Sequence, residues 1–101
     1  MSDLIFDHET IEKRTIDGIY FKALDVDKPV LFFISRKALE DMTRITTYVN
    51  RSKLRSIFTE NLGYIHRVTK SNYPFLELVS QFEYLQETKQ DAFLISADLF
   101  Q

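Results

Sequence analysis

The chain holds few side chains of the types that enzymes use for catalysis. It has no cysteine, which excludes disulfides, thiolate metal sites and cysteine nucleophiles. His8 and His66 are far apart in the sequence and match no metal-binding spacing such as His-x-x-x-His. Asp98 has no neighbouring carboxylate for an acid–base pair, and the two glycines are isolated, so there is no phosphate-binding loop. We therefore expect no catalytic residue, no cofactor and no metal ion, and a protein that is not an enzyme.

Positive charge is concentrated in the middle of the chain. Residues 36–70 contain eight basic and three acidic side chains, a net charge of +5, whereas the rest of the chain carries -7. A basic surface of this kind is suited to phosphate contacts, and tyrosines can stack on bases. The alternative interpretation is an ordinary solvated helix surface. The candidate interaction surface consists of Arg51, Lys53, Arg55, Arg67 and Lys70.

Length and composition predict one folded domain spanning residues 1–101. With 101 residues, a hydrophobic share of 45%, nine Phe and five Tyr, the chain has material for a core and is too apolar for a disordered segment. The beginning, MSDLIFDHET, lacks the basic and apolar regions of a secretory signal. The longest apolar run, Val30–Ile34, is far short of the ~20 residues that span a bilayer. We expect a cytoplasmic protein without membrane contact.

Alternating apolar residues and turn signals predict strands in the first third of the chain. Leu4–Phe6 is expected to form an edge strand. The pair Asp17-Gly18 predicts a hairpin turn in which Gly18 adopts a positive φ, followed by a half-buried strand over Ile19–Leu24. After a turn at residues 25–29, Val30–Ile34 is apolar on both faces and predicts a central strand. It is either covered on both sides within the chain, a third helix included, or covered on one side and open to a partner on the other, in which case the excess apolar surface marks an interface.

The rest of the chain is predominantly helical by its spacing. Ser35 is expected to cap a first helix, and the apolar stripe from Leu54 to Asn72 predicts one second helix. Asn61 lies in that stripe and needs a hydrogen-bond partner, whereas Gly63 lies opposite, either as a tolerated glycine or as a point of close approach in a dimer. A third helix over Phe75–Leu85 is favoured over a strand, and Ala92–Ile95 is expected to be a terminal strand.

These elements predict an α+β fold. We expect a small antiparallel sheet of three to five strands packed against two or three helices. Along the chain, the expected order of elements is two strands, an optional third strand, two helices, an optional third helix and a last strand.

The whole order of segments resembles the short bacterial proteins of the family called domain of unknown function 1488. The resemblance rests on FFIS-RKALEDM, LRSIFTENLGYIH and the ending ISADLF. Leu62 departs from the family pattern, since the family often has Arg at this position, and Pro74–Gln86 looks like an element added to that pattern. The residues that match the family pattern are Phe32, Phe33, Ile34, Ala38, Leu39, Phe58, Asn61, Ile65, His66, Tyr73, Ala97 and Asp98.

The resemblance implies an α+β domain with structural roles for these residues, and it implies no activity. Our first hypothesis is therefore a non-catalytic protein-interaction module, in its simplest version a homodimer, because closed two-fold pairs are the commonest oligomers. The second hypothesis is a nucleic-acid-binding accessory protein that uses the basic segment. The partner itself is not readable from the residues.

Overall fold

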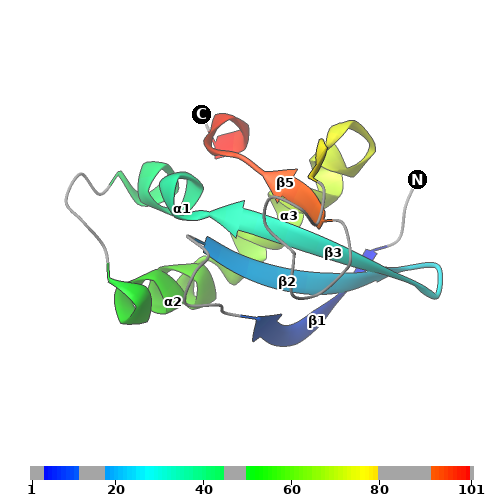
Figure 1. Ribbon diagram of the computed structural model, residues 1–101, viewed down its shortest axis with the longest axis horizontal. Coiled ribbons are helices and arrows are strands. Elements are labelled where there is room, and N and C mark those ends of the chain that lie inside the picture. Colours follow the sequence, from blue (N-terminus) through cyan, green and yellow to red (C-terminus); the bar gives the residue numbers. More distant parts are fainter. Residues whose placement is uncertain (1–3, 12–17, 45–49, 80–91, 101) are drawn as a thin grey trace.

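A five-stranded sheet and three α-helices make up the described part of the chain, residues 4–11, 18–44, 50–79 and 92–100 of this computed structural model (Figure 1). The sheet has the order β1-β2-β3-β5-β4. Its strands are β1 (Leu4–Ile11), β2 (Gly18–Asp25), β3 (Lys28–Ser35), β4 (Leu78–Val79) and β5 (Ala92–Ile95). The helices are α1 (Arg36–Thr43), α2 (Arg51–Glu60) and α3 (Leu62–Asn72), with 3₁₀ turns η1 (Tyr73–Phe75) and η2 (Ala97–Phe100). The α+β class is confirmed, with numbers of strands and helices inside the predicted ranges.

The three helices pack on one side of the sheet, which we call the helix face. This face carries the larger core, in which alternate residues of β2 and β3 contact apolar side chains of all three helices. The opposite side, the second face, carries a smaller buried cluster of Tyr20, Leu31, Phe33 and Ala92, with Leu94 against it. None of the described helices combines the length and the apolar character needed to cross a lipid bilayer.

Strand β3 is the centre of the sheet, as its composition predicts. It pairs with β2 along its full length and with β5 on the other side, and Val30–Ile34 are at most 6% exposed. Helices bury one side of this run, and on the other side Leu31 and Phe33 are at most 2% exposed in the single chain. Of the two alternatives for this strand, burial on both sides is therefore confirmed, and the prediction that these five residues form an interface is wrong.

The direction of β5 differs from the predicted antiparallel sheet. Phe32, Phe33 and Ile34 of β3 pair with Phe93, Leu94 and Ile95 in parallel, so the sheet is mixed. Between β3 and β5 the chain passes through the helices, and a connection of that length can return it in the same direction. Residue alternation indicates which side chains share a face, but it carries no information on strand direction.

The predicted positive φ at Gly18 is wrong, and the other residue of the predicted turn, Asp17, lies outside the described residues. Gly18 is the first residue of β2, pairs with Ser35, and does not have a positive φ. A Cβ at this position would overlap the carbonyl oxygen of Ile34 and lie 2.6 Å from Cζ of Phe33. Gly18 is therefore needed for close contact between β2 and β3 rather than for a turn.

A turn of this hairpin type lies between β2 and β3. Asp25 pairs with Lys28, and the two residues between them, Val26 and Asp27, have φ of 49° and 70°. Two central residues with positive φ are the mark of a type I′ turn, whose twist matches that of the flanking strands. The β-branched Val26 adopts this conformation at a steric cost, since its Cβ approaches the backbone.

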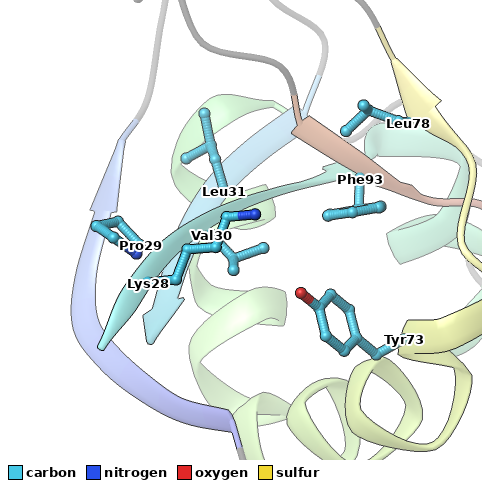
Figure 2. Close-up of a pocket in the computed structure, with 7 residues that line it drawn as sticks. All are labelled: Lys28, Pro29, Val30, Leu31, Tyr73, Leu78 and Phe93. Atoms are coloured by element: carbon cyan, nitrogen blue, oxygen red, sulfur yellow. The ribbon is translucent and has the colours of Figure 1, made fainter. Parts of the chain in front are cut away.

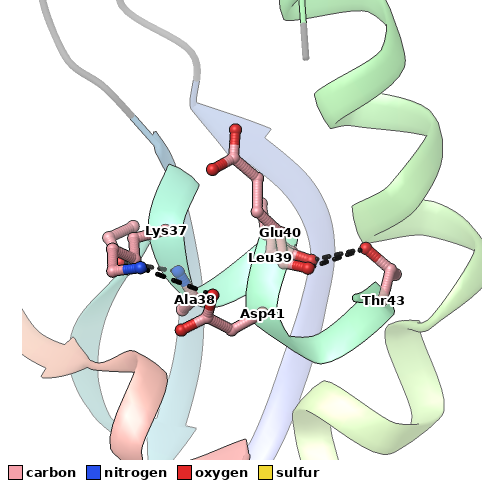
Figure 3. A network of polar contacts seen from close by, with 7 residues as sticks. Lys37, Ala38, Leu39, Glu40, Asp41 and Thr43 are labelled. Atoms are coloured by element: carbon pink, nitrogen blue, oxygen red, sulfur yellow. Dashed lines mark hydrogen bonds and ion pairs between the residues drawn. The ribbon is translucent and has the colours of Figure 1, made fainter. Parts of the chain in front are cut away.

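Helix α1 begins and ends at local signals. Ser35 Oγ accepts a hydrogen bond of 3.1 Å from the Ala38 N–H, which confirms the predicted cap. Near the other end, Thr43 Oγ1 donates to the carbonyl oxygens of Leu39 and Glu40, at 2.9 and 3.2 Å (Figure 3). Arg44 then takes a left-handed conformation with φ of 58°, and its N–H donates to the Asp41 carbonyl.

The predicted second helix is two helices that meet at Asn61. The predicted partner of this side chain is found, because Nδ2 donates to the Ile57 carbonyl at 2.9 Å. The backbone of Asn61 leaves helical geometry, with φ of -114° and ψ of 19°, and it both ends α2 and begins α3. Such competition of a side chain for a helix carbonyl bends helices. Both helices still bury apolar residues, Phe58 in α2 and Ile65 in α3.

The segment after Pro74 is not the favoured helix. Tyr73–Phe75 forms one 3₁₀ turn, Leu76 is extended, and Leu78–Val79 pairs with β5 as β4. Phe75 is 85% exposed, so the apolar side of the expected helix has no packing surface at its start. The remainder of the predicted helix, residues 80–85, lies outside the described residues. The terminal strand over Ala92–Ile95 is confirmed.

Candidate interaction site

An apolar row crosses three strands at the end of the sheet that carries the β2–β3 turn. Ile5 pairs with Leu24, and Leu24 pairs with Pro29. Directly opposed residues of neighbouring strands point to the same side, so these three side chains adjoin on the second face. Ile5 is 68% and Leu24 42% exposed, and Pro29 is also exposed. The row is thus an apolar surface that the described elements leave open to solvent.

This row borders a shallow cavity of about 290 Å³, which we call the hairpin groove. Two charged residues, Asp7 and Lys22, line it together with the row. Both are exposed, and they contribute one negative and one positive charge to the same surface. Alternation along β1 and β2 places Asp7 on the side of Ile5 and Lys22 on the side of Leu24. The groove therefore combines an apolar centre with balanced charge.

The outer edge of β1 is poorly suited to the addition of another strand. Phe6 pairs with Ala23, but the next pair is Thr10 with Phe21, so the register shifts between them. Such irregularities bend a strand and disturb its free hydrogen-bonding edge, which protects edges from pairing with another chain. A partner is therefore expected to contact the face of the sheet at the groove rather than to extend the sheet beyond β1.

A second cavity of about 250 Å³ lies on the other side of β3 (Figure 2). It forms because β5 pairs with β3 from Phe32 onward, which leaves no strand partner from β5 beside Lys28–Leu31. Lys28, Pro29, Val30, Leu31, Tyr73, Leu78 and Phe93 line this cavity, which we call the notch pocket. Pro29 belongs to both cavities, so the two adjoin at the start of β3.

Tyr73 forms one wall of the notch pocket and ties it to the β2–β3 turn. Its hydroxyl is directed toward β3 in Figure 2 and donates a hydrogen bond of 2.9 Å to Oδ2 of Asp25. Its ring makes edge contacts with Phe32 and Phe93, at centroid distances of 5.9 and 5.4 Å. Burial raises the pKa of Tyr73 above its usual 10.0, and the hydrogen bond to Asp25 and the negative charge there raise it further. The phenol is a neutral donor that braces the hairpin.

The predicted basic surface is divided among different sides of two helices. On α2, Arg51 and Arg55 are four residues apart and share a side, whereas Lys53 is two residues from each and points elsewhere. On α3, Arg67 lies 5.6 Å from the centre of the Tyr64 ring, and Lys70 is one turn away. Helical geometry therefore does not align the five cations in one row, and they are not among the residues that line either cavity.

Residues of the family pattern occupy mainly structural positions. Phe33, Leu39, Phe58 and Ile65 are buried, and Asn61 forms the junction of α2 and α3. His66 is half-buried and stacks on Phe6 with 3.9 Å between ring centres, which joins α3 to β1. Asp98 is exposed in η2. Tyr73 is the member that lines a cavity.

The candidate site thus differs from the one predicted from the sequence. The sequence singled out Val30–Ile34 and the basic residues as interaction surfaces, whereas Ile5, Leu24 and Pro29 entered it only as strand or turn residues. One signal was present: Leu24 shares the mixed face of its strand with Lys22, and an apolar residue on such a face is open to solvent unless something packs there. Among the described residues, no three His, Asp or Glu side chains are grouped so as to hold a metal ion.

In comparisons with known proteins, no family model, no curated protein and no solved structure matches this chain. The resemblance to the domain of unknown function 1488 family therefore stays a prediction.

Proposed function

We propose that this chain is a non-catalytic protein-interaction module of the cytoplasm that binds its partner through the hairpin groove. The observation that carries the proposal is the solvent-exposed row of Ile5, Leu24 and Pro29 across three neighbouring strands. Single exposed apolar residues are common on protein surfaces, but adjoining ones that border a cavity are typical of interaction sites.

The arrangement of the row supports a protein partner in particular. The side chains stand on paired strands of β1, β2 and β3, so their relative positions are held by the backbone ladder. A rigid apolar centre with charged side chains beside it is the usual composition of a protein–protein contact. The notch pocket adjoins the groove at Pro29 and offers further apolar surface to the same partner.

A nucleic-acid partner remains the second hypothesis, and the structure favours it less. Its five basic residues lie on different sides of α2 and α3, which gives a phosphate backbone no single row to follow. It is tested by a mobility-shift assay at low salt with single- and double-stranded DNA and RNA, in which binding should weaken steeply as salt is added.

The proposal is tested by Leu24→Asp, which places a charge in the apolar row. Tagged wild-type and L24D chains are co-expressed with an untagged copy in the native host, and the proteins recovered with each are compared. Because Leu24 is 42% exposed, the variant should fold, which circular dichroism and urea unfolding check. Phe75→Asp is the matched control, since Phe75 is 85% exposed and lines neither cavity.

We expect the wild-type and F75D chains to recover the same partner, whether another protein or the untagged copy, and the L24D chain to lose it. If folded L24D retains every partner that the wild type has, the groove is not the binding site and the proposal is wrong.

A further inference from the structure

We propose that the occupant of the hairpin groove is a second copy of this chain, which binds groove to groove about a two-fold axis. This inference rests on the proposed function and names its partner. It is carried by the charge pattern of the surface: one acidic residue, Asp7, and one basic residue, Lys22, line the groove beside the row of Ile5, Leu24 and Pro29.

A surface that meets its own copy must be complementary to itself. In a two-fold contact, residue i of one chain meets residue j of the other and residue j meets residue i. A groove with charges of one sign would repel its copy, because like charges brought together across an interface cost several kcal/mol. With Lys22 and Asp7 on the same groove, Lys22 of one copy can meet Asp7 of the other, and Asp7 of the first can meet Lys22 of the second. The apolar rows then meet at the centre of the contact.

Among the described residues, the hairpin end of the second face is the part that is exposed for this contact. The helices lie on the helix face, so a second sheet can approach the groove without displacing α1, α2 or α3 (Figure 1). The contact is confined to this end of the face, because Tyr20, Leu31 and Phe33 beside it are already buried in the single chain. The shifted register of β1 disfavours the alternative in which two copies join their sheets through β1.

The contact is expected to be weak. The exposed apolar part of each groove consists of only three side chains, below the roughly 20 residues a side of a standard stable interface. We therefore expect a monomer–dimer equilibrium with a Kd of about 10–500 µM, as is usual for small interfaces.

The test is a charge swap followed by sedimentation equilibrium at low salt. Asp7→Lys leaves only basic charges among the described residues that line the groove, and Lys22→Asp leaves only acidic ones, so each single variant should dimerise at least about tenfold more weakly than wild type. The double variant D7K/K22D restores one charge of each sign and should return the Kd to within about threefold of wild type. An equimolar mixture of the two single variants should form heterodimers, because a basic groove meets an acidic one.

Two control variants separate this contact from others. Lys53→Asp reverses an exposed charge on α2, outside the groove, and should leave the Kd unchanged. L24D should abolish dimerisation, because its charge enters the apolar centre.

A wild-type chain that stays monomeric up to about 1 mM overturns the inference, since a weaker contact would correspond to less than about 4 kcal/mol of binding free energy. A dimer that all three charge variants leave unchanged overturns it as well, because the contact then lies elsewhere. In either case, a different protein that the wild type recovers and L24D loses still supports the proposed function. If L24D loses no partner either, both proposals fail.

Discussion

The two glycines of this chain provide the most direct test of the packing between β2 and β3. The same substitution, Gly to Ala, meets opposite surroundings at the two positions. At Gly18 the added methyl group would overlap the backbone carbonyl of Ile34 and lie 2.6 Å and 2.8 Å from two ring carbons of Phe33. At Gly63, on the exposed side of α3, nothing lies within 4 Å of the added carbon.

The expected changes in the free energy of unfolding depend on which atoms must move to accommodate the added methyl group. At Gly18 the obstacle is backbone on one side and a ring that is 1% exposed on the other, so neither can turn away into solvent. Separating the end of β2 from β3 or shifting the ring costs about 1–3 kcal/mol, the usual range for overpacking. At Gly63 the methyl group is accommodated freely, and alanine should stabilise the helix by about 0.5–1 kcal/mol.

Urea unfolding followed by circular dichroism measures both changes in the free energy of unfolding. We expect G18A to lower it and G63A to raise it, a separation of at least about 1.5 kcal/mol between the variants. If G18A is within about 0.5 kcal/mol of wild type, the close approach of β2 and β3 is not a constraint on the fold and the reasoning fails. A G63A chain that is destabilised would indicate that another backbone approaches Gly63, as in a helix-mediated dimer.

Two further predictions concern the β2–β3 hairpin. Val26→Asn with Asp27→Gly places residues that tolerate positive φ at the turn and should raise the free energy of unfolding by about 1–2 kcal/mol; a loss of stability in urea unfolding would contradict the turn assignment. Folding raises the pKa of Tyr73, so the neutral phenol stabilises the folded chain. This contribution to the free energy of unfolding is fully present below the unfolded pKa of 10.0 and is lost as pH rises through the pKa of the folded chain. The stability advantage of wild type over Y73F should therefore shrink above about pH 10, and a constant advantage up to about pH 11 would refute this.

Local features of the fold were predictable from the residues themselves. The Ser35 cap, the buried strand over Val30–Ile34 and the hydrogen bond of Asn61 all depend on groups within a few residues of each other or on the alternation of one segment. The limit of such reasoning appears at the same residue, Asn61. The sequence shows that the Asn61 side chain needs a hydrogen-bond partner. It does not show that the helix breaks at Asn61, where the side chain bonds to Ile57, because the apolar stripe continues across the bend.

The candidate site was much less predictable. Basic residues stand out in a sequence because their charge is visible without any structure, and they drew the second hypothesis, that of a nucleic-acid partner, to α2 and α3. The groove residues do not stand out, since Ile5, Leu24 and Pro29 are 19 and five positions apart and meet only through strand pairing. Whether an apolar side chain is exposed depends on which other segments pack on it, so no local sequence pattern predicts its exposure.

The sequence alone determined the class of the fold, the identity of the central strand and the start of the first helix. These depend on hydrophobic periodicity and on capping, which act over one or two turns or one strand. Tertiary structure decided the parallel return of β5 beside β3, the role of Gly18 as a contact rather than a turn, and the open row at the hairpin end. Each of these depends on segments far apart in the chain, whose positions are settled only when the whole sheet is assembled.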